Sequence, residues 1–123
     1  MSCVMDPREV AASLSEYWSP RILAELNDSF VKVAKIFGEF PWHAHEHEDE
    51  MFMVLEGEMS IELNDRTVHL KCGEMFVVPK GTPHHPVAQD ECLIMLFEMK
   101  STEHTGGLVI DMTRTVEEQR GQQ

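Results

Sequence analysis

The chain has 123 residues, of which 42% are hydrophobic, and this is the size of one ordinary domain with a packed core. Its formal net charge is −12 with histidine counted as neutral, so it repels phosphate backbones and anionic lipid surfaces. The composition therefore argues against a disordered chain, a nucleic-acid partner and a membrane partner.

The sequence predicts a cytoplasmic protein. Its first 18 residues lack the continuous apolar core of a signal peptide, and its longest apolar run, residues 92–97, is too short to span a bilayer. Cys3, Cys72 and Cys92 are too scattered for a disulfide framework or a thiolate zinc site. We therefore expect three reduced cysteines.

The N-terminal part of the chain carries the only sustained helical pattern. Apolar residues recur at helical spacing over residues 8–26, Pro7 suits a first helical turn, and Pro20 breaks or restarts the helix. Asn27 follows as an end signal. We predict an N-terminal helical arm over residues 1–29, which packs either on its own domain or across a two-fold subunit interface.

From Phe30 onward the period changes to the alternation of half-buried strands. The expected strands are VKVAKIFGEF, EMFMVLEG, EMSIEL, RTVHL, EMFVVP, HHPVA and ECLIMLFEM. Turn signals separate them, among them Asn64-Asp65 and Gln89-Asp90. Seven or eight short strands predict an all-β sandwich or barrel over residues 30–110, followed by a frayed polar tail over residues 111–123.

The stretch WHAHEHEDE, residues 42–50, is either a metal site or a solvated acidic loop. In a strand, His43 and His45 project from the same face, roughly 6.5–7 Å apart along the chain. Two imidazoles at this separation can reach one ion with bonds of about 2.0–2.1 Å for zinc. Glu50 has the wrong parity in an unbroken strand, but a loop or bulge over residues 46–49 would bring it to the same face.

A candidate for a fourth ligand lies in GEMFVVPKGTPHHPVA, residues 73–88. There an apolar strand is followed by a tight bend at Pro79 and Gly81, and His84 comes next. Its position after a rigid turn, downstream of a His-x-His pair, makes it a stronger candidate than a lone histidine.

Two motifs in this region resemble the signatures of the cupin family, in particular of small single-domain bacterial cupins. The pattern HxHx4Ex6G, from His43 to Gly57, is similar to the first cupin motif, and Gx5PxGx2H, from Gly73 to His84, is similar to the second. The resemblance covers about residues 30–99. It departs from the family pattern at Gly38, one residue closer to the first histidine than is usual, and at Ala88, where the second motif often has asparagine.

The resemblance implies a double-stranded β-helix, or jelly-roll barrel, with a metal ion held by His43, His45, Glu50 and His84. Three imidazoles and one carboxylate suit one divalent transition metal per chain, Fe, Mn, Ni, Co or Zn, and discriminate poorly among them. An octahedral ion would keep about two positions for water, substrate or dioxygen.

The remaining histidines and the methionines receive simpler interpretations. His47 falls in the predicted turn and is either exposed or an alternative ligand, and His85 is structural or solvated. His69 and His104 are expected at the surface. Most of the nine methionines lie in strand patterns, which favours core packing over a copper site.

Two functions from different classes remain open. The first is a small metal-dependent enzyme, of dioxygenase, isomerase or lyase type, that acts on a small oxygenated molecule. The second is a non-catalytic module that binds or senses a metal or ligand. The fold does not choose between them, because this barrel hosts many chemistries. In either case we predict a homodimer with a small-molecule ligand or substrate.

Overall fold

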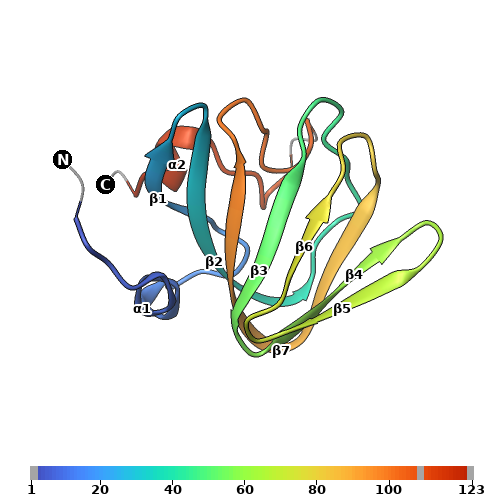
Figure 1. Ribbon diagram of the computed structural model, residues 1–123, viewed down its shortest axis with the longest axis horizontal. Helices are drawn as coiled ribbons and strands as arrows, with labels where there is room; N and C mark the ends of the chain where they lie inside the picture. The colour runs from blue at the N-terminus through green and yellow to red at the C-terminus, as the bar shows by residue number, and fades with distance from the viewer. Residues whose placement is uncertain (1–2, 108–109, 122–123) are drawn as a thin grey trace.

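A computed structural model describes residues 3–107 and 110–121 and shows mostly antiparallel β-structure, as predicted (Figure 1). The elements are α1 (Pro7–Ser13), β1 (Arg21–Leu26), β2 (Ser29–Glu39), β3 (Glu50–Glu56), β4 (Glu58–Leu63), β5 (Thr67–Lys71), β6 (Met75–Val78), β7 (His84–Met99) and α2 (Val116–Gln119).

The strands form two layers that share β7. Five of them lie side by side in the order β1-β2-β7-β3-β6, and the β4–β5 hairpin pairs with the first half of β7 (Figure 1). The hairpin turns at Asn64-Asp65 as predicted, where the Leu63 N–H donates to the Arg66 carbonyl at 2.7 Å. This sharing encloses the core between the layers.

Strand β7 corrects one prediction. Gln89-Asp90 was expected to be a turn between two strands, but β7 runs without interruption through both residues. The pairing of β2 with β7 shifts register between Ile36, opposite Cys92, and Gly38, opposite Ala88. This irregularity accommodates the extra residues of β7. It requires a positive φ at Gly38, which is 82° and which glycine adopts without strain.

The predicted helix over residues 8–26 is correct only in its first part. Helix α1 ends at Ser13, and residues 21–26 form β1, which pairs antiparallel with β2. Asn27, with a φ of 54°, lies in the hairpin turn that joins the two strands. Residues 21–26 have only a weak helical preference, and the hydrogen bonds that they gain by pairing with β2 outweigh it. Tertiary context often overrides helix propensity in this way.

Helix α1 packs on its own chain. Asp6 caps it by accepting from the backbone N–H groups of Arg8 and Glu9. Ala11 and Leu14 are buried against Val33 and Leu93 on the outer face of the five-stranded layer. In this structure the helix packs in cis, which is one of the two predicted arrangements.

The C-terminal tail is more ordered than expected. Residues 116–119 form α2, and Thr115 and Glu118 cap it reciprocally through a capping box. Gln119 is only 1% exposed. Residues 115–119 of the tail are therefore anchored to the domain, while residues 122–123 lie outside the described part of the chain.

The main core lies between the two layers and consists of side chains from most strands. Its buried members are Trp18, Ala34, Ile36, Phe40, Phe52, Val54, Met59, Ile61, Leu70, Val78, Ala88, Cys92, Ile94 and Leu96. The methionines contribute less than predicted, because Met59 is buried but Met75 and Met99 are 50% and 44% exposed.

The glycines of the two motifs provide a test of the fold. Gly57 and Gly73 have the same φ of 86°, but a Cβ at Gly57 would lie 3.1 Å from the Glu91 carbonyl oxygen, whereas at Gly73 it would meet no atom within 4 Å. Gly73→Ala should cost about 1–2 kcal/mol of unfolding free energy through φ alone. Gly57→Ala should cost more in urea denaturation, and equal losses would contradict the close packing of Gly57.

Candidate metal centre

The two motif segments are joined by backbone hydrogen bonds. The His43 N–H donates to the His84 carbonyl at 3.1 Å, and the His84 N–H donates back to the His43 carbonyl at 2.9 Å. The Gly81 N–H donates to the His45 carbonyl at 2.8 Å. These bonds place the His-x-His pair beside the start of β7.

Glu50 reaches the same place through the predicted loop. The chain leaves the extended conformation after His45 and re-enters a strand at Glu50, the first residue of β3. Asp49 fixes this loop, because its Oδ1 accepts the backbone N–H of Lys80 at 2.8 Å. Asp49 thus has a structural role in this loop.

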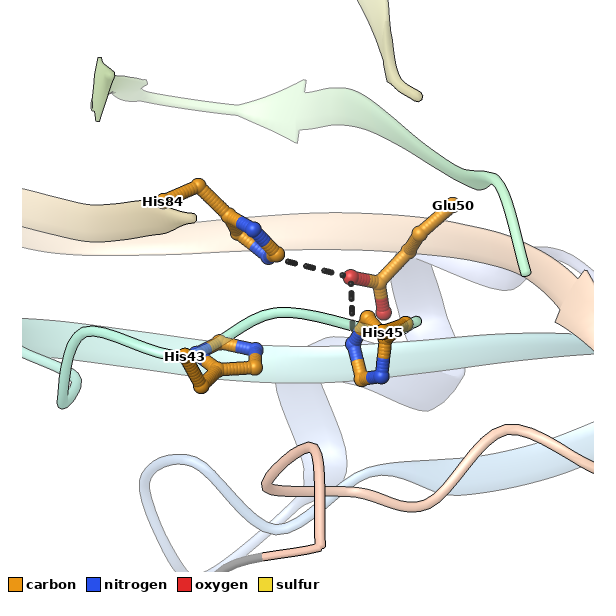
Figure 2. A group of neighbouring side chains, drawn as sticks. All are labelled: His43, His45, Glu50 and His84. Carbon is orange, nitrogen blue, oxygen red and sulfur yellow. Dashed lines mark ion pairs between the residues drawn. The ribbon is translucent and has the colours of Figure 1, made fainter. Parts of the chain in front are cut away.

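The side chains of His43, His45, Glu50 and His84 converge, and each offers one potential ligand atom within 4.8 Å of the others. Figure 2 shows the Glu50 carboxylate directed at His45 and His84, with His43 alongside. Glu50 Oε1 lies 3.2 Å from His45 Nε2 and 3.5 Å from His84 Nε2. All four residues are buried.

Backbone carbonyls orient two of the imidazoles. His43 Nδ1 lies 2.9 Å from the Pro41 carbonyl oxygen, and His84 Nδ1 lies 2.9 Å from the Thr82 carbonyl oxygen. A carbonyl only accepts, so each Nδ1 carries the proton and each Nε2 presents a lone pair. This is the arrangement in which histidine binds metals.

The hydrogen-bond inventory also fits a metal ion. Within the described residues, both ring nitrogens of His45, Glu50 Oε1 and His84 Nε2 are buried without a hydrogen-bond partner. Buried polar atoms are normally satisfied, and each unsatisfied one costs about 1–3 kcal/mol. A cation at this point would satisfy several of these atoms at once.

The protonation states suit a ligand set. Burial, assisted by the charge of His84, lowers the pKa of His43 to about 4, so its imidazole is neutral at pH 7. Burial alone would raise the pKa of Glu50, but the neighbouring Glu98 carboxyl group and the imidazoles of His45 and His84 hold that pKa well below 4.5. The site therefore offers a neutral imidazole at His43 and an ionised carboxylate at Glu50.

Two charged residues beside the site were not predicted. Glu98 and Lys32 are 4% and 1% exposed, and the Lys32 ammonium lies 2.6 Å from Glu98 Oε1. Burial and the neighbouring Glu50 raise the pKa of Glu98 well above 4.5. The sequence could have shown that Glu98 is buried, because strand alternation puts it on the inward face of ECLIMLFEM together with Ile94 and Leu96.

His104 was expected at the surface, and this prediction was wrong. Its ring lies 5.3 Å from that of Phe40, and burial, reinforced by the charge of Lys32, lowers its pKa to about 4. The backbone N–H of Arg114 donates to its Nδ1 at 2.9 Å, so the ring proton of the neutral form is on Nε2. No sequence pattern around His104 marks this position.

His104 and the candidate ligands share a small cavity inside the sandwich. It has a volume of about 40 Å³, and His43, Glu50 and His104 line it together with apolar side chains that include Trp18, Phe40 and Phe52. The cavity is therefore apolar except at the candidate metal centre and at His104.

The other histidines lie away from the centre. His47 is exposed in the loop before β3, and His69 is exposed and hydrogen-bonded to Ser60. His85 has a structural role: its ring nitrogens lie 3.0 Å from carboxylates of Glu39 and Glu62, and Trp42 stacks on it. Trp42 is 44% exposed and thus lies on the outer side of His85.

The chain belongs to the cupins: the model of the Cupin_2 family, described as a cupin domain, matches residues 30–97. The resemblance read from the two histidine motifs is thereby confirmed for the family and for the fold.

Relatives agree with this assignment. The crystal structure of a cupin-2 domain containing protein from Shewanella frigidimarina is 42% identical, with a TM-score of 0.76 over 79% of this chain and 95% of that one. Uncharacterized protein YdbB of Bacillus subtilis is 34% identical over 84% of this chain and 92% of its own. A 3-hydroxyanthranilate 3,4-dioxygenase 2 of Aspergillus fumigatus is 32% identical over 60% of this chain, but over only 42% of its own length.

Among the described residues, no helix has the length and apolar character needed to cross a membrane.

The low pKa values of His43 and His104 predict an acid-sensitive fold. Between pH 6.5 and about 4 the unfolded chain binds protons at these histidines that the folded chain does not. The free energy of unfolding should therefore decrease as the pH is lowered through this window. The loss is roughly 3 kcal/mol at most for a group shifted this far. Urea denaturation of the metal-free protein should show a shallower fall for His104→Gln and an unchanged one for His47→Gln; a pH-independent stability would contradict this account.

Proposed function

We propose that this cupin is a small metal-dependent enzyme that acts on a small oxygenated molecule, with dioxygenase chemistry as the first candidate. One divalent transition metal ion would be held by His43, His45, Glu50 and His84. The observation that carries the proposal is the convergence of these four buried side chains, whose ligand atoms lie within 4.8 Å of one another.

The donor set defines what a bound ion could do. Three neutral nitrogens and one carboxylate oxygen carry a ligand charge of −1, so a divalent ion would stay cationic and supply Lewis-acid or redox chemistry. Fe, Mn, Ni, Co and Zn all accept such donors. The protein's own part is to hold the lone pairs in place through the carbonyl contacts of His43 and His84.

The cavity suggests which molecules could approach. Its lining is mainly apolar, which would exclude water, and His104 Nε2–H offers a hydrogen-bond donor to a ligand oxygen. The nearby cation, Lys32, is engaged by Glu98 and Gln119. These features favour a small, uncharged ligand with one polar end, and the dioxygenase names of several relatives support oxygen chemistry.

The small cavity also favours the second candidate, a non-catalytic module that holds a metal or a small ligand. A volume of about 40 Å³ has room for only a few heavy atoms unless side chains move. An enzyme for a larger substrate would need such movement.

Metal analysis and oxygen uptake test the proposal together. Elemental analysis of the purified protein should find close to one transition metal per chain, and His84→Ala should lose most of it because one of four ligands is gone. His69→Ala, at an exposed histidine, is the control. Equal and near-zero metal in all three proteins would refute the metal centre.

The Fe(II)-loaded protein would then be screened in an oxygen electrode with 3-hydroxyanthranilate, hydroquinone and smaller phenols and enols. Uptake that is lost in His84→Ala supports the dioxygenase. Bound metal without turnover across the screen supports the binding module.

We also propose that the protein is a cytoplasmic homodimer that associates through the outer face of its larger layer. Two cross-strand rows of apolar side chains lie on that face: Val77, Met51, Phe97 and Val31 in one, and Met75, Met53 and Met95 in the other. Met75 and Val77 are 50% and 43% exposed. Contiguous apolar rows of this kind are typical of subunit interfaces.

The dimer can be tested with a charge on this face. Val77→Lys should shift sedimentation velocity from a dimer to a monomer, because burying an unpaired ammonium is costly. Ile110→Lys, at another exposed apolar residue, should leave the dimer intact. A monomeric native protein, or a dimer that tolerates Val77→Lys, would refute the proposed interface.

A further inference from the structure

A buried polar chain leads away from the candidate ligand Glu50. Glu98 lies directly opposite Glu50 in the pairing of β3 with β7, on the inward face, and each of the two carboxyl groups shifts the pKa of the other. Glu98 Oε2 and Glu50 Oε1 are both buried without a hydrogen-bond partner among the described residues. Glu98 is only 4% exposed. The closest polar neighbour of Glu50 outside the histidines is therefore a second carboxyl group with little access to water.

Lys32 is the next member of this chain. It comes from β2, which flanks β7 on the side away from β3, and it is 1% exposed. Its ammonium lies 2.6 Å from Glu98 Oε1 and also donates to Gln119 Oε1. Both partners are buried, so the position of the ammonium is fixed by two contacts.

Gln119 connects the chain to the C-terminal helix. Its side-chain oxygen accepts from Lys32, while its Nε2 donates to the Arg114 carbonyl at 2.9 Å. It is 1% exposed, and the capping box at Thr115 holds the helix that carries it. The path from α2 to Glu50 is thus continuous through Gln119, Lys32 and Glu98.

Stability alone does not account for such a chain. Replacing a buried ion pair by well-packed apolar residues is often neutral or stabilising. The strand faces around Lys32 and Glu98 are otherwise apolar, with Ala34 and Leu96 as inward neighbours. Glu98 lies beside the candidate ligand Glu50, and Lys32 and Gln119 continue from it, which points to a role at that site.

We propose that Glu98 is a positioning residue that holds the Glu50 carboxylate in the orientation that binds the metal, and that Lys32 and Gln119 hold Glu98. The C-terminal helix is then a part of the metal centre. This inference rests on the proposed metal site. Losing an outer hydrogen-bond partner of a metal ligand typically lowers metal affinity by about 10–100-fold.

Zinc affinity, measured on the full-length protein by competition with a chromophoric chelator, tests the role of Glu98. Glu98→Leu should weaken zinc binding by about tenfold or more. Glu98→Gln should retain most of the affinity, because its amide can donate to Glu50 and accept from Lys32. The absorption spectrum of the Co(II)-loaded protein should change in Glu98→Leu and stay close to native in Glu98→Gln.

Variants of α2 test the other end of the buried polar chain, at Gln119. Gln119→Leu should weaken zinc binding in the same direction, and Gln119→Glu should restore it because it again offers Lys32 an acceptor. Glu117→Leu, at an exposed position of the same helix, is the matched control and should bind zinc like the native protein. Thermal unfolding of each metal-free variant shows whether a weakened variant is still folded.

The outcomes separate the two proposals. If the native protein binds zinc and folded Glu98→Leu and Gln119→Leu bind it equally well, the positioning chain is refuted while the metal site stands. If zinc affinity falls only in proportion to the stability of the metal-free protein, and the Co(II) spectrum is unchanged, the buried polar residues have only a structural role. The inference is then also refuted. If the native protein binds no zinc or cobalt, both proposals fail.

Discussion

The candidate centre depends on one piece of backbone pairing, between residues 43–45 and residues 81–84. The two segments are far apart in sequence, and their three hydrogen bonds set the distance between the imidazoles on either side. Gly81 makes the approach possible with a φ of 77°. The same backbone supplies the carbonyls of Pro41 and Thr82 that orient two of the rings. Main-chain geometry therefore determines both the position and the tautomer of His43 and His84.

The interior around this pairing is unusual in carrying several charges. An apolar core normally excludes carboxylates and ammonium groups unless they are paired. Here Glu50, Glu98 and Lys32 lie in one buried group, between two β-layers whose other inward side chains are mostly apolar. The low local dielectric strengthens each interaction in the group and makes an unpaired member costly. This explains why the centre combines buried ligands with an ordered C-terminal helix.

Much of the site could be predicted from the sequence, because its signals are local. The spacing of His43 and His45, the polar loop before Glu50 and the rigid bend before His84 each act within a few residues. The failures have non-local causes. Residues 21–26 form a strand because β2 is available to pair with them, and no local pattern shows this. His104 reaches the cavity through a path of the chain that follows no strand or helix period, and the partnership of Glu98 with Lys32 requires the strand order.

Strand β7 has a consequence for how the protein folds. It pairs with β2, β3 and β4, and it carries His84 at its beginning and Glu98 near its end. During synthesis the first three candidate ligands emerge well before β7 is complete, and neither layer can close without it. Pairings between distant segments of this kind form slowly. The four candidate ligands are therefore brought together late in folding, in an assembled domain rather than on a nascent chain.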